Sequence, residues 1–372
     1  MRIRLENGRI VTPQGVLDGA EVTIASGTIV TLGPVSGGKA DRAIDLEGGW
    51  VLPGFIDTQV NGGGGVLFND EVDVGAIAAI GAAHAQFGTT AFLPTLISDT
   101  PDQIAAALAA VDAAIDHGVP GVVGIHVEGP FINEVKRGIH EARRIRRLDA
   151  DTLALLAAPR RGRVMLTLAP ELCDESDIRT LVEHGVIVSA GHTNATYDEM
   201  MGAIGAGLTG FTHLFNAMSP LHHRNPGAVG AAFDSSTYCG IIVDDAHLHP
   251  AVIRLAVRAK GVERLMLVTD AMPSVGTNDS EFMLQGKRIM VRNGVCLFED
   301  GTLAGTHLDM ASALRNTIAE TGLSVAEAAV MASATPARFL ALETHGELAP
   351  GKRADWVWLD DKLQPRGTWI GG

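Results

Sequence analysis

The sequence predicts an α/β protein built on a (β/α)8 TIM-like barrel, with a small β-sandwich domain assembled from both ends of the chain. Apolar, strand-like runs alternate with Ala-rich helical segments through the middle of the chain, and several of these helical segments end in Gly. Strand-like runs dominate both termini. A doubly wound open sheet is the alternative, but the chain has no G-x-G-x-x-G motif to support a dinucleotide site.

Length and charge narrow the class of protein. With 372 residues, of which 46% are hydrophobic, the chain is long enough for one large domain and a smaller one. A net charge of −14 disfavours nucleic acid and anionic membranes as partners. No window approaches the roughly 18 apolar residues that span a bilayer, and no signal-type segment opens the sequence. We therefore expect a cytoplasmic protein.

Both termini carry the sequence features of β-strands. Short strand-like runs fill the first 50 residues, where Asn7-Gly8 and Ser26-Gly27 are hairpin-type turn pairs. Similar runs, ADWVWLD and PRGTWI, return near the C-terminus. These patterns predict a β-domain from residues 1–52 and 345–372, around a barrel domain over residues 53–344.

The apolar runs of the predicted barrel end in side chains that can coordinate a metal or transfer a proton. The C-terminal ends of barrel strands converge on one mouth, so such residues become neighbours there. The onset of polarity at strand ends explains one or two of them, but explains the whole series poorly. The series is Gln59 and Asn61, Thr95, Glu128, Glu171, His192, His213, Asp244 with His247, and Asp270.

Within this series, Glu128, His192 and His213 form a candidate metal-ligand set. Catalytic zinc commonly takes three protein ligands and leaves one position open for water. Asp270, at the end of LMLVTDA, is a candidate base that could accept a proton from that water and deliver it to a leaving nitrogen. Capping of the next helix is the alternative role for Asp270. His84, in a helical pattern, is interpreted as a packing or surface residue.

Motifs along nearly the whole chain resemble the N-acetylglucosamine-6-phosphate deacetylases, a branch of the amidohydrolase superfamily. They are PGFIDTQVNG, GIHVEGPF, KRGIH, VSAGHTNAT, THLFNAMSP, GIIVDDAHLHP, LVTDAM and GTLAG, in the same order. The resemblance implies hydrolysis of the acetamide of N-acetyl-D-glucosamine 6-phosphate to glucosamine 6-phosphate and acetate. It also implies a homodimer.

The resemblance also bears on the number of metal ions. Many amidohydrolases carry a His-x-His pair after the first barrel strand, where this chain has Gln59 and Asn61. Neutral amides bind divalent metals weakly. None of the six lysines falls in a predicted barrel strand, where a carboxylated lysine bridges two metals in binuclear relatives. We expect one divalent ion per subunit, with zinc first and iron or another ion as alternatives.

Further roles follow from the resemblance alone. The metal or His247 would polarise the acetamide carbonyl. Arg224 would bind the phosphate, and the loop that carries it could complete a neighbouring subunit's site. His307 departs from the small hydroxyl residues common at that position, which leaves the choice between glucosamine and galactosamine epimers open. The implied substrate-binding positions are Gln59, Asn61, Ile139, His140, Asn216, Ala217, Arg224, His247, Thr306 and His307.

Three other functions remain open from the sequence. One is a deacetylase of a related N-acyl substrate, such as N-acetylgalactosamine 6-phosphate or an N-acyl amino acid. A second, a cyclic-amide hydrolase, is disfavoured by the missing strand lysine. The third is a non-catalytic barrel that binds sugar phosphates. The presence of Asp270 beside a complete ligand set argues against it, because a binding protein needs no base.

Overall fold

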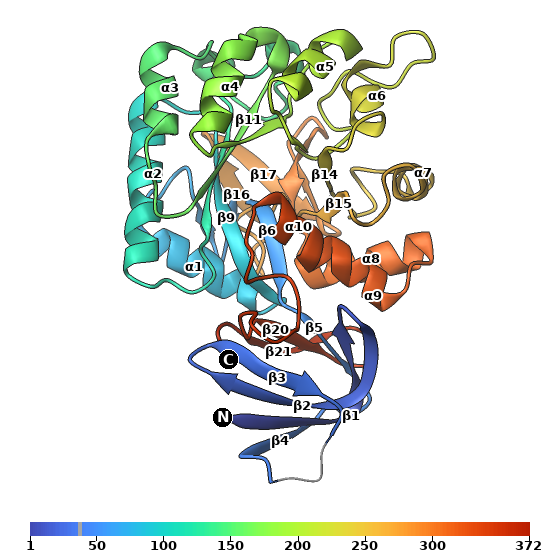
Figure 1. Ribbon diagram of the computed structural model, residues 1–372. Helices are drawn as coiled ribbons and strands as arrows, with labels where there is room; N and C mark the ends of the chain where they lie inside the picture. The colour runs from blue at the N-terminus through green and yellow to red at the C-terminus, as the bar shows by residue number, and fades with distance from the viewer. Residues whose placement is uncertain (36–38) are drawn as a thin grey trace.

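A computed structural model describes residues 1–35 and 39–372, and it confirms the predicted (β/α)8 barrel (Figure 1). Eight parallel strands follow one another around the barrel in chain order, and nearly all of their residues are buried. They are β6 (Phe55–Val60), β9 (Thr89–Ile97), β10 (Gly124–Glu128), β11 (Arg163–Leu168), β12 (Ile187–Ala190), β13 (Gly210–Phe211), β14 (Tyr238–Ile241) and β15 (Leu265–Leu267).

The barrel closes between β6 and the segment that follows β15. The backbone N–H of Asp270 donates to the carbonyl oxygen of Gln59 at 3.0 Å. Val60 and Ala271 form a parallel bridge beside this contact. The closure therefore places the first strand's polar end next to the last strand's carboxylate.

The helices lie outside the strands, as in other barrels of this class. Most begin at a side-chain cap, such as Asp73, Thr100, Asp149 or Asp309, and Thr196 and Glu199 form a capping box. In the described part of the chain, no helix is long and apolar enough to cross a membrane. The α-helices are α1 (Val74–Ala85), α2 (Pro101–Asp116), α3 (Ala150–Ala157), α4 (Glu175–Glu183), α5 (Tyr197–Gly205), α6 (Gly227–Phe233), α7 (Pro250–Lys260), α8 (Met310–Thr321), α9 (Val325–Ala329) and α10 (Thr335–Phe339).

Short helical turns join some of these elements. The 3-10 turns η1 (Glu134–Lys136) and η2 (Ala142–Arg144) lie between β10 and α3, and η3 (Pro170–Leu172) follows β11. A π-helical turn, η4 (Val330–Ala334), joins α9 to α10.

Strands from both ends of the chain form one seven-stranded sheet next to the barrel (Figure 1). Its core is a separate hydrophobic cluster that includes Leu5, Val22 and Trp356. This cluster supports the domain boundaries at residues 52/53 and 344/345, which stay a prediction. The strands are β1 (Arg2–Thr12), β2 (Gly15–Ala25), β3 (Thr28–Gly33), β4 (Arg42–Asp45), β5 (Trp50–Pro53), β20 (Trp356–Leu359) and β21 (Pro365–Trp369).

One predicted turn in this sheet is wrong. Ser26 and Gly27 do connect β2 to β3, but Asn7 and Gly8 lie within β1, where the register with β2 shifts. This irregularity lets β1 pair with β4 through one half and with β5 through the other. The Asn-Gly pair is favoured both in hairpin turns and in strand bulges, because both need a positive φ at one position, here Asn7.

A second sheet interrupts the barrel between β15 and α8, and the sequence did not predict it. It is a four-stranded antiparallel sheet that packs on Ile97 and Met272 near the barrel mouth. A parallel bridge between Ala271 and Thr306 attaches it beside Asp270. Its strands are β16 (Glu281–Leu284), β17 (Lys287–Arg292), β18 (Val295–Leu297) and β19 (Leu303–Thr306).

The barrel interior contains a chain of buried polar side chains beneath the mouth. His126 of β10 contacts the hydroxyls of Thr95 at 3.2 Å and Thr167 at 2.7 Å. Thr167 contacts Thr212 at 2.7 Å, which in turn contacts Ser189 at 2.8 Å. Burial lowers the pKa of His126 to about 4, so the ring is neutral near pH 7. This layer joins neighbouring strands by hydrogen bonds just below the polar strand ends.

The glycine run after β6 packs against the segment that follows Asp270. Gly62 and Gly63 form β7 (Gly62–Gly63), which pairs with β8 (Val66–Leu67). The N–H of Gly62 donates to Ala271, and those of Gly64 and Gly65 donate to the carbonyls of Val275 and Pro273, at 2.7–3.0 Å. A Cβ at Gly62 would collide with backbone, while Gly64 and Gly65 adopt positive φ values that favour glycine.

His84 holds this run from the helix side. It is fully buried in α1, and its Nε2 donates to the carbonyl oxygen of Gly62 at 2.9 Å. His84 is therefore a buried packing residue, as one of the two interpretations held, and its ring also fixes the backbone that follows Asn61.

We expect Gly62→Ala to destabilise the protein. The added Cβ would lie 2.4 Å from the Val66 carbonyl oxygen and 2.9 Å from the Pro273 nitrogen, so backbone must shift. Overpacking of this kind costs about 1–3 kcal/mol. Thermal denaturation should show a lower Tm than in Gly205→Ala, whose Cβ meets no heavy atom within 4 Å. Equal Tm values for the two variants would contradict this packing argument.

Candidate active site

Three ligand atoms from separate strand ends converge at the barrel mouth. Oε1 of Glu128 lies 3.2 Å from Nε2 of His192 and 3.1 Å from Nε2 of His213, and the two nitrogens are 3.1 Å apart. All three side chains are buried. Ligands about 2.0–2.1 Å from a tetrahedral ion stand roughly 3.3–3.4 Å from one another, close to this triangle.

The protonation of this cluster also fits a metal. Nδ1 of His192 donates to the carbonyl oxygen of Lys136 at 2.8 Å, so the lone pair of Nε2 points toward Glu128 and His213. Two facing imidazole nitrogens need a cation or a proton between them. Burial raises the pKa of the Glu128 carboxyl, but its contacts with both imidazoles hold the pKa well below the usual range. The residues present therefore fit a divalent ion.

His140 belongs to a looser cluster with two of these residues. Its nearest nitrogen lies within 4.8 Å of ligand atoms of Glu128 and His192, and its ring packs edge-on against His192. Nδ1 of His140 accepts from the N–H of Ser98 at 3.3 Å, which places the ring proton on Nε2. Nε2 is then a hydrogen-bond donor. The set with His213 is the tighter of the two, and His140 presents a donor to the same cavity.

Amide side chains hold Asp270 beside the candidate metal site. Nε2 of Gln59 donates to Asp270 at 3.1 Å and to Glu128 at 3.2 Å, and Nδ2 of Asn61 donates to Asp270 at 2.7 Å. Burial and the Glu128 charge raise the pKa of Asp270 to about 6. The amide of Gln59 occupies the space between two carboxylates, where a second ion would need to bind.

Two further carboxylates join neighbouring segments: Asp57, which lies within β6, and Glu171 of the predicted strand-end series. Asp57, fully buried, accepts from the hydroxyl of Thr269 at 2.5 Å and ties β6 to the segment that carries Asp270. Burial raises the pKa of Asp57 to about 7. Glu171 accepts from Thr193 and from the Asn194 N–H, both at 2.6 Å, and so fixes the loop after His192.

The backbone at this mouth is strained. His192, His213, Ala217 and Asp270 have φ values of 48°, 34°, 50° and 52°. Residues other than Gly rarely adopt this left-handed backbone conformation, and each instance costs roughly 1–3 kcal/mol of folding free energy. Such conformations persist where the surrounding structure enforces them, and here they direct three functional side chains to one point.

A cavity of about 140 Å³ lies over the convergent ligand atoms. It brings the predicted Ile139, His140, Asn216, Ala217 and His247 together with the metal set and Asp270. It also contains residues that sequence reasoning missed: Gly138, Ile242, Leu303 and Gly305. Glycine and aliphatic side chains carry no chemical signal, and Leu303 and Gly305 come from the unpredicted β19.

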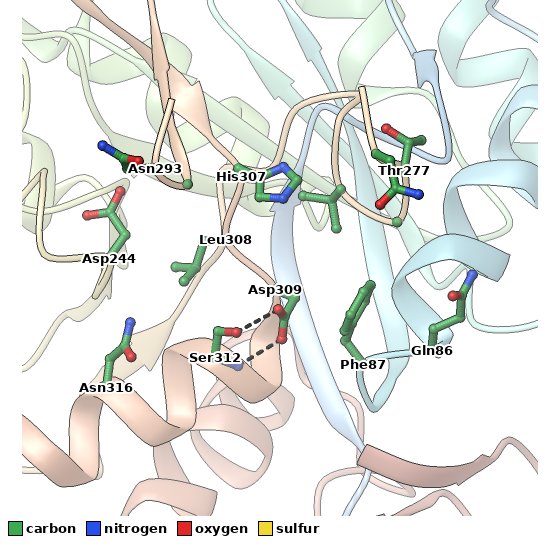
Figure 2. A pocket seen from close by; sticks show the side chains of 14 residues that line it. Gln86, Phe87, Asp244, Thr277, Asn293, His307, Leu308, Asp309, Ser312 and Asn316 are labelled. Atoms are coloured by element: carbon green, nitrogen blue, oxygen red, sulfur yellow. Dashed lines mark hydrogen bonds between the residues drawn. The ribbon is translucent and has the colours of Figure 1, made fainter. Parts of the chain in front are cut away.

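Five predicted substrate residues do not line this cavity, and Arg224 is one of them. Gln59 and Asn61 lie behind Asp270, each 1% exposed. Thr306 is buried and donates to the Thr269 carbonyl oxygen at 2.6 Å. His307 lies in a second cavity of about 600 Å³, where its Nδ1 is 2.9 Å from the Ser274 hydroxyl (Figure 2). Side chains alternate along β19, so Leu303 and Gly305 face the first cavity while Thr306 does not.

Arg224 lies elsewhere on the same chain. It is exposed in the loop before α6 and lines a different cavity, together with Asn194, Tyr197 and Pro220. Within one subunit the structure therefore does not bring Arg224 to the ligand set.

A (β/α)8 barrel that presents two imidazoles, a carboxylate ligand and a nearby base defines the class of metal-dependent hydrolases. Residues 50–372 match the amidohydrolase family, and the chain belongs to this family.

Similar proteins narrow the class further. The chain is 43% identical to N-acetylgalactosamine-6-phosphate deacetylase from Shewanella sp. (strain ANA-3), over 99% of this chain and 94% of the relative. It is 38% identical to N-acetylglucosamine-6-phosphate deacetylase from Homo sapiens, over 90% of this chain and 85% of the relative. The crystal structure of N-acetylglucosamine-6-phosphate deacetylase from Pasteurella multocida superposes with a TM-score of 0.96 at 33% identity. It covers 100% of this chain and 99% of that one.

We expect Gln59→Leu to weaken metal binding, because it removes the hydrogen bond that orients the Glu128 carboxylate. Loss of an outer partner of a metal ligand typically lowers affinity about 10–100-fold. Competition with a chelator measures the affinity for Zn²⁺. The matched control is Gln86→Leu, the same change at an exposed position; equal affinities in both variants would refute the role given to Gln59.

Proposed function

We propose that the chain hydrolyses the acetamide of N-acetyl-D-glucosamine 6-phosphate to glucosamine 6-phosphate and acetate. The observation that carries this proposal is Asp270, held by two amides beside the convergent atoms of Glu128, His192 and His213. A catalytically inactive sugar-phosphate-binding barrel has no use for this base. The deacetylase relatives support an amide of an amino sugar, in preference to an N-acyl amino acid, as the bond that is cleaved.

Glu128, His192 and His213 would hold one divalent ion per subunit, and such an ion lowers the pKa of a bound water toward about 7 and polarises a carbonyl. Two imidazoles and a carboxylate suit Zn²⁺ best and also accept Fe²⁺ or another divalent ion. The amide of Gln59 between the two carboxylates supports a single ion.

The residues of the chain move the protons. Asp270 accepts the proton of the attacking water as the new C–O bond forms, and donates it to the amine nitrogen as the C–N bond breaks. A pKa raised to about 6 leaves Asp270 able to do both near neutral pH. His140, which carries its proton on Nε2, lines the cavity and can donate to a substrate oxygen there, whereas His247 lines the same cavity and can accept from a substrate hydroxyl.

The galactosamine epimer is a second candidate substrate, favoured by the 43% identity to the Shewanella relative. His307 is no longer the residue expected to decide the choice, because it lies in the second cavity. Leu303 and Gly305, which line the first cavity, are better placed to contact a sugar ring.

The phosphate requires a cation from outside this cavity. Arg224 is exposed on its loop, and its planar guanidinium matches a phosphate dianion. We propose that the protein is a homodimer in which Arg224 of one subunit reaches the site of the other.

Acetate release by the purified protein tests the proposed activity. The substrates are N-acetylglucosamine 6-phosphate, N-acetylgalactosamine 6-phosphate and unphosphorylated N-acetylglucosamine, and metal content is measured on the same preparation. We expect turnover of a phosphorylated substrate and about one metal ion per chain. Two ions per chain at full occupancy would overturn the single-ion argument, and no acetate from any of the substrates would overturn the function.

Asp270→Asn should lower the rate of acetate release about 10²–10⁴-fold, the range typical of a general acid–base group. Asn can keep the contacts with Gln59 and Asn61 but cannot carry the proton. Metal content should stay near one ion per chain. A variant with near-normal rate would refute the assignment of the base.

Arg224→Ala should raise the KM for the phosphorylated sugar about tenfold or more, the cost of losing a charged hydrogen bond. The KM for N-acetylglucosamine should change little. Arg143→Ala is the control, since Arg143 is also exposed and is paired with Glu141. Equal effects of Arg224→Ala on both sugars would mean that this arginine does not bind phosphate.

A further inference from the structure

Asp244 and His247 form a buried pair at the edge of the metal cavity. Both lie in the turn after β14, and their side chains are 5% and 8% exposed. Nδ1 of His247 lies 2.7 Å from Oδ2 of Asp244. His247 lines the metal cavity, whereas Asp244 faces the second cavity near Asn293 and Asn316 (Figure 2).

The second carboxylate oxygen of Asp244 is held by the backbone. Oδ1 accepts from the N–H of Ala246 at 3.0 Å and from the N–H of His247 at 2.8 Å. Asp244 is thus fixed by three donors from the same turn, and its Oδ2 is aimed at the ring. Burial raises the pKa of Asp244, but the hydrogen bonds from His247 and the backbone outweigh it, so the carboxyl is ionised near neutral pH.

A helix outside the turn holds it in place. Nδ2 of Asn316, in α8, donates to the carbonyl oxygen of Val243 at 2.9 Å. The turn itself includes Asp245 in the left-handed region, with a φ of 63°. The position of the pair is therefore set by the barrel and by α8.

This geometry determines which nitrogen of His247 can act on a substrate. An ionised carboxylate only accepts hydrogen bonds, so Nδ1 must carry a proton. The hydrogen bond made by one ring nitrogen fixes the state of the other. Nε2 is therefore left as the nitrogen available to the metal cavity, in a ring that cannot rotate without breaking the contact with Asp244.

We propose that Asp244 is a positioning residue for His247, which holds the Nδ1–H tautomer and aims Nε2 at the substrate in the metal cavity. The proposal deepens the proposed deacetylase function and rests on it for its kinetic effect. The tautomer itself does not depend on that function, and can be measured without any substrate.

Asp244→Asn is a sharp test because the backbone fixes how the amide must point. Its Oδ1 would keep accepting the two backbone N–H groups, so its NH₂ group would face Nδ1 of His247. Nδ1 must then accept, and the ring proton moves to Nε2. The substitution reverses the tautomer with almost no change in shape.

The experiment uses the zinc-loaded protein and two readouts. The first is ¹⁵N NMR of the His247 ring, assigned by comparison with His247→Gln; we expect Nδ1–H in the native chain and Nε2–H in Asp244→Asn. The second is acetate release from N-acetylglucosamine 6-phosphate, where we expect kcat/KM to fall about 10–100-fold, as for other partners that orient a functional histidine.

A double variant separates positioning from a merely structural role. In the His247→Gln background, Asp244→Asn should cause no further loss of kcat/KM, because residues that act as a unit are not additive. Asp245→Asn is the matched control: this neighbouring carboxylate is exposed and should leave both the His247 tautomer and kcat/KM unchanged.

Each failure has a distinct meaning. An unchanged His247 tautomer in Asp244→Asn overturns the proposal, and so does a full additional loss in the double variant. If the tautomer reverses but neither native chain nor variant releases acetate from any amino sugar, the proposed function fails while the assignment of the pair stands.

Discussion

The closure of the barrel between β6 and the segment after β15 is the constraint on which the site depends. The hydrogen bond from the Asp270 N–H to Gln59, and that from the Thr269 hydroxyl to Asp57, join two segments more than 200 residues apart. This closure places the amides of Gln59 and Asn61 against the Asp270 carboxylate. Without it, Asp270 would be a strand-end residue with no fixed relation to Glu128.

The same closure explains why two amides can replace a pair of metal ligands. A buried carboxylate pair such as Glu128 and Asp270 repels itself unless a cation or hydrogen-bond donors lie between. The Nε2 group of Gln59 donates to both carboxylates and so screens the pair without adding charge. The negative charge that remains favours the single ion held by Glu128, His192 and His213, and leaves Asp270 with a raised pKa suited to proton transfer.

The sequence predicted the barrel and the convergence of Glu128, His192, His213 and Asp270, because both follow from period, composition and the geometry common to all parallel barrels. It could not predict the inserted sheet β16–β19, whose short strands are only partly buried and lack a clear alternation. Because this sheet was not predicted, Thr306 and His307 were predicted as substrate-binding residues, whereas Leu303 and Gly305 line the cavity. A polar side chain marks a candidate from sequence, whereas the face that it occupies depends on strand register.

The roles within the polar series also depend on partners that a single sequence does not reveal. Glu171 ends an apolar run just as Glu128 and Asp270 do, yet hydroxyl and backbone donors from a neighbouring loop satisfy its carboxylate. A carboxylate whose oxygens all accept hydrogen bonds from the protein stabilises the structure. A carboxylate that faces another charge across a cavity can transfer a proton. Asp244 combines the two: its backbone contacts occupy one oxygen, and this immobility lets the other orient His247.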